Sequence, residues 1–170
     1  LAERDQRHAR FGGTRYAVEP NVKDGKGGLR DLHTLFWISK YAYRLDHVRG
    51  VLGAGILRTS EARAFASSQR FLWTVRCFLH QHHGREDDRL TFDAQMQLAP
   101  LMGFADRSGL RGVERFMKRY YLAARQVGNL TRIFCAALAT DFDQRPRLSL
   151  RKLWVAGVAQ RLNIKPFTLE

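Results

Sequence analysis

The sequence predicts an all-α fold, an antiparallel bundle of long helices, and three observations lead to that prediction. Three long segments carry apolar residues at spacings of three and four, which is the period of an amphipathic helix. Glycines and capping residues stand at the ends of these segments. The chain of 170 residues is 45% hydrophobic, enough for a sizeable core in one compact domain.

The first part of the chain is predicted to be short elements joined by loops. Residues 1–10 are charged and predict the tail of a helix that stops at Gly12 and Gly13, because paired glycines favour a left-handed end. Residues 14–20 predict a short extended segment before Pro20. The stretch PNVKDGKGGLRD at 20–31, which we call the glycine loop, then leads directly into an apolar helix.

The first long helix is predicted to begin at Asp31. One of its faces carries Leu32, Leu35, Phe36, Ser39 and Tyr43, and a second face carries Trp37, Ile38 and Tyr41. A helix that is apolar on two faces is expected to be buried on most sides. A loop follows that contains Gly50, Gly53 and Gly55.

The second long helix is predicted over residues 59–83, with Gly84 as its stop. Thr59 or Ser60 can cap its start and Glu61 can support the cap. Its expected inward stripe consists of Phe65, Leu72, Val75, Phe78, Leu79 and His82. A shorter helical segment is predicted over residues 92–104, around Pro100.

The third long helix is predicted from Val113 to Leu138 and is expected to pack antiparallel in the bundle. Its stripe is formed by Val113, Phe116, Met117, Tyr120, Ala124, Val127, Thr131, Phe134 and Leu138. Residues beyond Pro146 fit either a weak helix or short extended pieces. Asp141 and Asp143 are expected in a loop that ends the helix, although this spacing of carboxylates also occurs in two-metal sites.

Composition restricts the classes of partner. Lys and Arg outnumber Asp and Glu by 29 to 16, so the formal charge is +13 and an anionic partner is expected. The sequence contains neither a long apolar run nor a secretory signal pattern, which predicts a soluble cytoplasmic protein without a membrane partner. Cys77 and Cys135 lie in apolar helical patterns, which predicts reduced, buried thiols. The chain begins with Leu1, and we take it as a piece of a longer protein.

The glycine loop is the strongest candidate site. Its glycines expose backbone N–H groups just before a helix start, where the helix dipole favours anions, and its basic residues add full charges. The candidate nucleotide-binding residues are Lys23, Lys26, Gly27, Gly28 and Arg30. The alternative is a plain turn, with Asp31 stabilising the first helical turn.

Other clusters predict no chemistry. His80, His82 and His83 precede Glu86, Asp87 and Asp88, but helical geometry spreads these side chains, so we expect no metal site and no cofactor in this chain. We also find no nucleophile with a base at a usable spacing, so no catalytic residue is assigned. The basic residues are spread over all helices, which makes nucleic acid an unfavoured partner.

Three blocks carry a resemblance to a known family. They are EPNVKDGKGGLRDLHTLFWI at 19–38, DDRLTFDAQ at 87–95 and VERFMKRYY at 113–121. In this order they resemble the bifunctional PII uridylyltransferase and uridylyl-removing enzyme of bacterial nitrogen regulation, over about residues 14–139. That family has a nucleotidyltransferase domain, a helical linker, a metal-dependent HD phosphohydrolase domain and two ACT domains that sense glutamine.

The resemblance concerns the helical linker alone, which is similar to the substrate-binding helical domain of nucleotidyltransferases. It implies a junction from the upstream domain over residues 1–30, a helical bundle over 31–140, and a tail over 141–170 that leads to an HD domain. The whole enzyme is expected to use Mg²⁺, to transfer UMP from UTP to a tyrosine of the PII signal protein, and to remove it when glutamine is abundant. The fragment itself is expected to be inactive.

The resemblance also gives the candidate residues a role. The side chains of the glycine loop and its Gly27 and Gly28 amides would face the neighbouring active site and hold UTP phosphates. For DDRLTF, a polar turn clamped by Leu90 and Phe92 is favoured over ionic contacts with PII or across the bundle. The alternative function is a basic helical interaction module that binds an acidic protein or nucleic acid.

Overall fold

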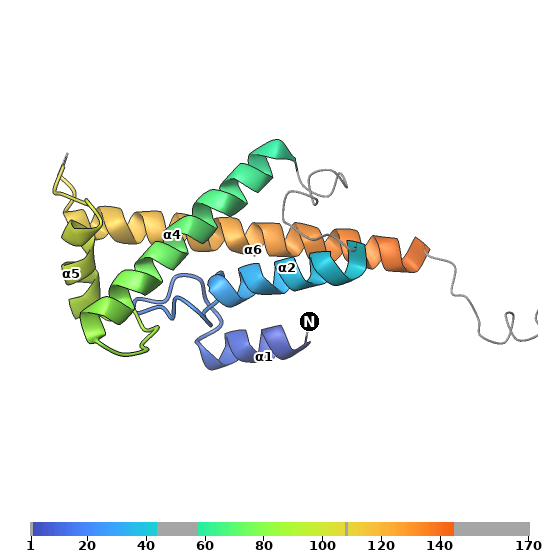
Figure 1. Ribbon diagram of the computed structural model, residues 1–170, viewed down its shortest axis with the longest axis horizontal. Helices are drawn as coiled ribbons and strands as arrows, with labels where there is room; N and C mark the ends of the chain where they lie inside the picture. The colour runs from blue at the N-terminus through green and yellow to red at the C-terminus, as the bar shows by residue number, and fades with distance from the viewer. Residues whose placement is uncertain (1, 44–57, 108, 145–170) are drawn as a thin grey trace, which may run out of the picture. The chain divides into compact units, whose positions relative to one another are not determined.

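The computed structural model describes residues 2–43, 58–107 and 109–144. Within these ranges the chain forms helices and no strand, which confirms the all-α prediction (Figure 1). The helices are α1 (Ala2–Arg10), α2 (Leu29–Tyr43), α4 (Thr59–His83), α5 (Phe92–Leu101) and α6 (Gly112–Gln144). None of them is both long enough and apolar enough to cross a membrane.

The chain divides into two compact units, residues 1–137 and 138–170. Most of the described residues belong to the first unit. The predicted division at residues 30 and 140 concerns the longer protein and stays a prediction. The loop with Gly50, Gly53 and Gly55, and the tail beyond Pro146, lie outside the described residues.

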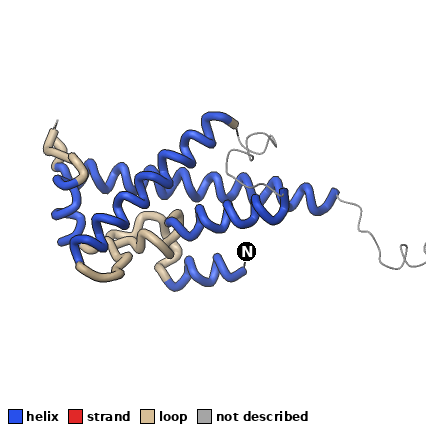
Figure 2. Tube along the Cα trace, viewed as in Figure 1, coloured by secondary structure: helices blue, strands red, loops and turns tan. Residues whose placement is uncertain are grey.

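Three helices make the body of the first unit. In Figure 1, α4 runs in the opposite sense to α2 and α6, as expected for neighbours in an antiparallel bundle. The side chains of Ser68 on α4 and Gln126 on α6 are joined by a hydrogen bond of 2.7 Å. In Figure 2, loops 84–91 and 102–111 lie at the two ends of α5, and loop 11–28 meets loop 84–91, where the Val22 N–H donates to the Asp88 carbonyl at 2.8 Å and the Leu90 N–H donates to the Pro20 carbonyl at 2.9 Å.

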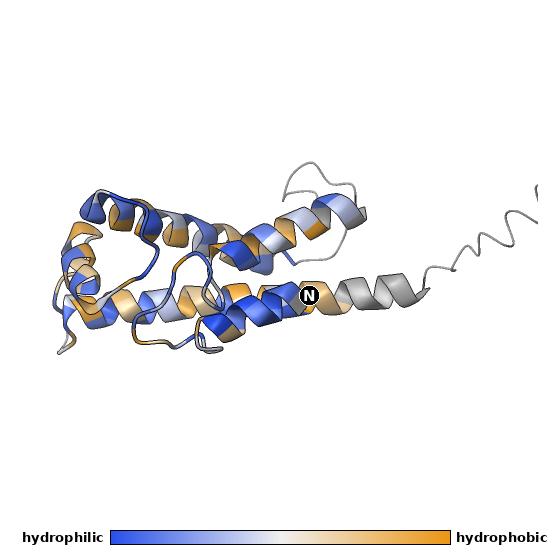
Figure 3. Cartoon of the chain, turned by 90° about the horizontal axis from the view of Figure 1, so that it is seen from below, coloured by the Kyte–Doolittle hydropathy of each residue, from blue (hydrophilic) through white to orange (hydrophobic). Residues whose placement is uncertain are grey.

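The core follows the predicted stripes. Along α6 the buried side chains recur every three or four residues, and α4 contributes a matching set, so apolar and polar bands alternate along the helices in Figure 3. Burial of this surface is the main force that holds the unit together. The buried hydrophobic residues of α4 and α6 are Phe65, Leu72, Val75, Leu79, Phe116, Met117, Tyr120, Ala123, Ala124, Val127, Leu130 and Phe134.

The expected burial of α2 on most sides is wrong for the part of the chain that the structure describes. Trp37 is 63% exposed and Tyr41 is 87% exposed, whereas Leu32 and Leu35 are buried. Among the α2 side chains whose burial is described, the fully buried ones lie on one stripe. The periodicity correctly marked the apolar positions, but it does not tell which of two apolar faces has a neighbour.

The second long helix has its predicted bounds, but its N-cap residue differs from the prediction. The N-cap is Arg58, and the Glu61 carboxylate accepts a hydrogen bond of 2.7 Å from the Arg58 N–H. Thr59 and Ser60 therefore lie in the first helical turn, so the predicted cap at either residue is wrong, whereas Glu61 supports the cap as predicted. Gly84 ends the helix at φ 62°, as predicted.

Three further expectations are corrected. His82 is exposed rather than on the inward stripe, because the buried stripe ends at Leu79, one turn earlier. Cys77 is exposed and Cys135 is half-buried, and both are free thiols, so the expected burial fails for Cys77. Asp141 and Asp143 lie within α6, which continues to Gln144 instead of ending in a loop before them.

Candidate functional site

The glycine loop is closed by hydrogen bonds among its own residues. The Asn21 side chain accepts hydrogen bonds from the N–H groups of Lys23 (3.0 Å) and Asp24 (2.6 Å). The N–H of Leu29 then donates to the Val22 carbonyl at 3.0 Å. Such side-chain turns favour a compact loop over an open one. The loop is therefore a folded element that leads into α2.

Packing requires glycine at three positions of this loop, since a Cβ at Gly25 would collide with the Asn21 carbonyl oxygen, and Gly27 and Gly28 are also confined. Gly27 has φ 84°, and a Cβ there would collide with the carbonyl oxygen of Ala124 on α6. At Gly28, a Cβ would lie 2.7 Å from the carbonyl oxygen of Val22. Close approach of backbone to backbone is a standard reason for glycine. The loop thus touches α6 directly, and this contact accounts for part of its glycine content.

The amides predicted to meet phosphate have internal acceptors in this structure. The N–H of Gly27 donates to the Asp31 carboxylate at 2.9 Å, and the N–H of Gly28 donates to the Gly25 carbonyl at 2.9 Å. A buried N–H must be paired in this way or pay a large desolvation cost. An anion would therefore have to be met chiefly by side chains.

Asp31 is the centre of a buried ionic network. Its carboxylate accepts from Arg7 Nη2 at 2.6 Å and contacts His8 Nε2 at 2.9 Å, while the side chain of Asp31 is only 2% exposed. The network ties α1 to the glycine loop and to the start of α2. Sequence reasoning gave Asp31 only a dipole role, because its partners lie 23 and 24 residues away and no local spacing marks them.

The three predicted cations do not converge on one point. Lys23 Nζ lies 3.8 Å from Asp88, Lys26 Nζ donates to the Gly13 carbonyl at 3.0 Å, and Arg30 Nε donates to Asp24 at 2.5 Å. Each cation thus has an internal partner. Lys26 also lines a pocket between α1 and α6, whereas the other two face elsewhere.

A second ionic cluster surrounds Asp88 in the DDRLTF turn. Arg76 Nε donates to the Asp88 carboxylate at 2.6 Å, and His80 Nε2 lies 3.0 Å from the same oxygen. Burial would raise the pKa of Asp88, but hydrogen bonds from Arg76 and His80, with the nearby charge of Lys23, together lower the pKa. Arg76 and His80 are four residues apart on α4, a spacing that could have revealed this cluster.

The expected clamp of this turn is confirmed at Leu90 and wrong at Phe92. Leu90 is fully buried, whereas Phe92 is 56% exposed. Arg89 pairs with Glu19 at 2.7 Å, and Arg85 lies 3.5 Å from Asp87. The Arg89–Glu19 ion pair and the buried Leu90 side chain therefore both fix the position of the turn. Among the residues that the structure describes, no group of three His, Cys, Asp or Glu side chains is arranged to hold a metal.

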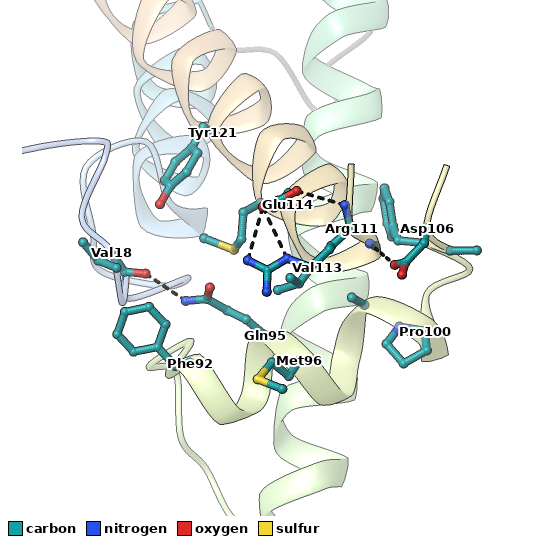
Figure 4. Close-up of a pocket in the computed structure, with 15 residues that line it drawn as sticks. Val18, Phe92, Gln95, Met96, Pro100, Asp106, Arg111, Val113, Glu114 and Tyr121 are labelled. Carbon is teal, nitrogen blue, oxygen red and sulfur yellow. Dashed lines mark hydrogen bonds and ion pairs between the residues drawn. The ribbon is translucent and has the colours of Figure 1, made fainter. Parts of the chain in front are cut away.

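A pocket of about 620 Å³, which we call the apolar pocket, lies between α5, the start of α6 and residue 18. In Figure 4, Phe92, Gln95 and Met96 stand on one side, with Glu114 and Tyr121 of α6 on the other. Gln95 links α5 to residue 18 by donating a hydrogen bond to the Val18 carbonyl at 2.8 Å.

The lining of the apolar pocket suits contact with apolar groups better than chemistry. Phe92 and Met96 are both more than half exposed at its mouth. Of its two acidic groups, Asp106 accepts a hydrogen bond of 2.6 Å from the Gly112 N–H, and Glu114 is engaged by the Arg111 N–H and side chain, which lowers the pKa of Glu114. Sequence reasoning missed this pocket because three separate elements form it.

Comparison with known proteins gives the family. The family model described as GlnD PII-uridylyltransferase matches residues 1–135. A bifunctional uridylyltransferase/uridylyl-removing enzyme of Azospirillum brasilense is 51% identical over all 170 residues, which span 18% of that enzyme. A protein of the same name from Nitrobacter hamburgensis is 56% identical over 138 residues, which are 81% of this chain and 15% of that enzyme. Another from Novosphingobium aromaticivorans is 47% identical over 170 residues, which are 100% of this chain and 18% of that enzyme.

No solved structure matches the chain. The chain spans less than a fifth of the length of each of these relatives. The match with the family model covers α1, the glycine loop, α2, α4, α5 and the part of α6 up to residue 135. The chain therefore belongs to the GlnD PII-uridylyltransferase family.

Proposed function

We propose that this chain is the helical domain of a bifunctional enzyme that transfers UMP from UTP to a tyrosine of the PII signal protein and removes it hydrolytically in response to glutamine. One observation carries the proposal. The chain is 51% identical along its whole length to an enzyme named for both uridylyl transfer and uridylyl removal. The relatives' name favours this reading over a basic module that binds an acidic protein or nucleic acid.

In this proposal the domain supports the nucleotide or acceptor cleft and carries no complete catalytic site. Transfer of UMP joins the tyrosine oxygen to the α-phosphorus of UTP and releases pyrophosphate, so triphosphate charge must be held during the reaction. Removal adds water across the bond between tyrosine and UMP. Among the described residues no three His, Cys, Asp or Glu side chains are grouped to hold a metal, and in this proposal the Mg²⁺ of the whole enzyme is bound by its catalytic domains.

The glycine loop is proposed to face the neighbouring active site and to help hold UTP. Lys23, Lys26 and Arg30 would supply the charge, with Gly27 and Gly28 allowing the loop to approach closely. Because both amides have internal acceptors, the contact would fall to the side chains. Lys26 would exchange the Gly13 carbonyl for a phosphate oxygen, which is a stronger, charge-assisted partner.

The test compares both activities in the full-length enzyme. Lys23→Ala combined with Arg30→Ala is expected to lower UMP transfer about tenfold or more, because charged hydrogen bonds to the substrate are lost. UMP removal should change little. Arg63→Ala, an exposed arginine on α4, is the matched control. Equal loss of both activities together with a lower Tm would show that the loop is architectural, and no loss of either would exclude the phosphate role.

The partners and the location belong to the same proposal. PII and UTP would bind the whole enzyme, glutamine would act at domains outside this chain, and the enzyme would work in the cytoplasm. The isolated chain is expected to show no UMP transfer. A radiolabel transfer assay with UTP and PII measures this, and turnover by the pure chain would place catalysis inside the helical domain.

A further inference from the structure

A second pocket, which we call the basic pocket, lies between α1, residues 13–15, Lys26 of the glycine loop and the adjacent face of α6. Its volume is about 510 Å³, within the range of pockets that hold small ligands. Four cationic side chains line it, namely Arg4, Arg15, Lys26 and Arg132. No sequence motif singles it out, since its residues come from four segments.

The carboxylates that also line the basic pocket are already neutralised. Asp31 is held by Arg7 at 2.6 Å and by His8 at 2.9 Å. Asp5 pairs with Arg4 at 2.9 Å. These pairs use one lining cation, Arg4, and leave Arg15, Lys26 and Arg132 without a carboxylate partner among the described residues. The pocket therefore keeps a surplus of positive charge.

Arg15 gives an independent indication of a ligand site. Its Nε is buried, and no acceptor for it is found in the described part of the chain. A buried donor without an acceptor is uncommon in folded proteins and calls for a water, an ion or a ligand. The side chain lies against Gly128 of α6, where a Cβ would collide with the guanidinium. Gly128 thus makes room for Arg15 at the pocket.

Arg132 completes the arrangement. It lies four residues after Gly128, so the two positions share one face of α6. Its side chain is exposed, and within the described ranges it makes neither a hydrogen bond nor an ion pair. Guanidinium groups present parallel donors that match the oxygens of phosphate, and a neighbouring ammonium adds a point charge.

We propose that the basic pocket is a phosphate-binding site in which Arg15, Lys26 and Arg132 hold a pyrophosphate group, either free or as part of a nucleoside triphosphate. The site goes beyond the proposed function, with which it shares only Lys26. A small oxoanion fits better than a protein surface, because Arg15, Lys26 and Arg132 line a pocket of about 510 Å³ rather than a flat face.

The binding experiment uses the 170-residue chain and isothermal titration calorimetry. Inorganic pyrophosphate and UTP are expected to bind in a saturable 1:1 manner, and uridine, which has no phosphate, is expected not to bind. Equal affinity for pyrophosphate and UTP would assign the site to the free anion, and tighter binding of UTP would assign it to the nucleotide. Higher salt should weaken both, since the contacts are ionic.

Variants separate the pocket from general positive charge. Arg15→Gln and Arg132→Gln are each expected to weaken pyrophosphate binding about tenfold or more. Arg70→Gln removes the same charge from an exposed position on α4 outside the pocket and should leave binding unchanged. Gly128→Ala keeps every charge but displaces Arg15, so it should also weaken binding. A Tm for each variant shows that it is folded.

Several results would overturn the site. They are absence of saturable binding by both phosphate compounds, an equal loss in Arg70→Gln, or tighter binding of a polyglutamate peptide that depends on the same arginines. The proposed function is judged separately, by UMP transfer and removal in the full-length enzyme. If those activities are absent while pyrophosphate still binds the chain, the proposed function fails and the basic pocket stands.

Discussion

Removal of the Asp31 carboxylate should destabilise the first unit more than the loss of any exposed carboxylate. Asp31→Ala leaves the buried Gly27 N–H without its acceptor, at a cost of about 1 to 3 kcal/mol. It also leaves the Arg7 guanidinium, whose side chain is 12% exposed, without its counter-charge. Breaking a buried pair from one side typically costs about 3 to 5 kcal/mol in total.

The assay is thermal and urea unfolding of the 170-residue chain, followed by far-UV circular dichroism. For a chain of this size each kcal/mol lowers the Tm by about 2 to 4 °C, so the Tm of Asp31→Ala should fall by roughly 6 to 20 °C. Asp31→Asn keeps the volume and one acceptor, and it should fall between this variant and the wild type. The result measures the strength of the joint between α1 and α2.

The control is Asp5→Asn, an exposed carboxylate on α1 whose partner is the adjacent Arg4. It removes the same charge from α1, the helix that Asp31 joins to α2, and should change the Tm little. If both Asp31 variants shift the Tm no more than this control does, the buried network does not hold α1 to the glycine loop. The reasoning about the loop as a folded element would then be refuted.

Three further predictions concern single side chains. Gly27→Ala should lower the free energy of unfolding in urea by about 1 to 3 kcal/mol, because the positive φ is strained for alanine and the added Cβ would meet the backbone of α6. Gly84→Ala, where the Cβ would have open space, should lower it by about 1 kcal/mol. The lowered pKa of Asp88 stabilises the fold at pH values above its ordinary 3.8, and this stabilisation is lost as the pH falls through the lowered pKa, so Asp88→Asn should flatten the acid limb of a Tm-against-pH curve. Exposed Cys77 should react with a thiol reagent faster than half-buried Cys135 in the native chain, and equal rates would contradict the described exposure.

The sequence predicts local structure well here because helices have a strong period. The extent of α4 follows from the spacing of apolar residues, and its end follows from the stop at Gly84, although its N-cap residue was not predicted. The exposed face of α2 could not be predicted in the same way. Apolar residues at Trp37 and Tyr41 mark a face, but burial depends on whether a neighbour covers it, and periodicity carries no information about neighbours.

The candidate site was predictable in part. The glycine loop stands out in sequence because glycine and lysine are concentrated before a helix, but its contacts are long-range. Gly27 meets α6, and Asp31 meets α1, across sequence separations that local patterns do not encode. The Asp88 cluster is easier to predict from sequence, since Arg76 and His80 lie one turn apart on α4 and both contact the same carboxylate.

The glycine content of the loop supports phosphate binding less than the sequence suggests. Gly27 is required by the approach to α6, and its N–H is used by Asp31, so a purely architectural loop needs it equally. The case for an anion therefore depends on side chains, and Lys26 is the one that belongs both to the loop and to the basic pocket. Lys26→Gln should weaken pyrophosphate binding while leaving the Tm unchanged, since its only described partner is an exposed carbonyl contact with Gly13. If the Tm falls and binding does not, Lys26 serves to fasten the loop, and the charge that the sequence places there has a structural purpose.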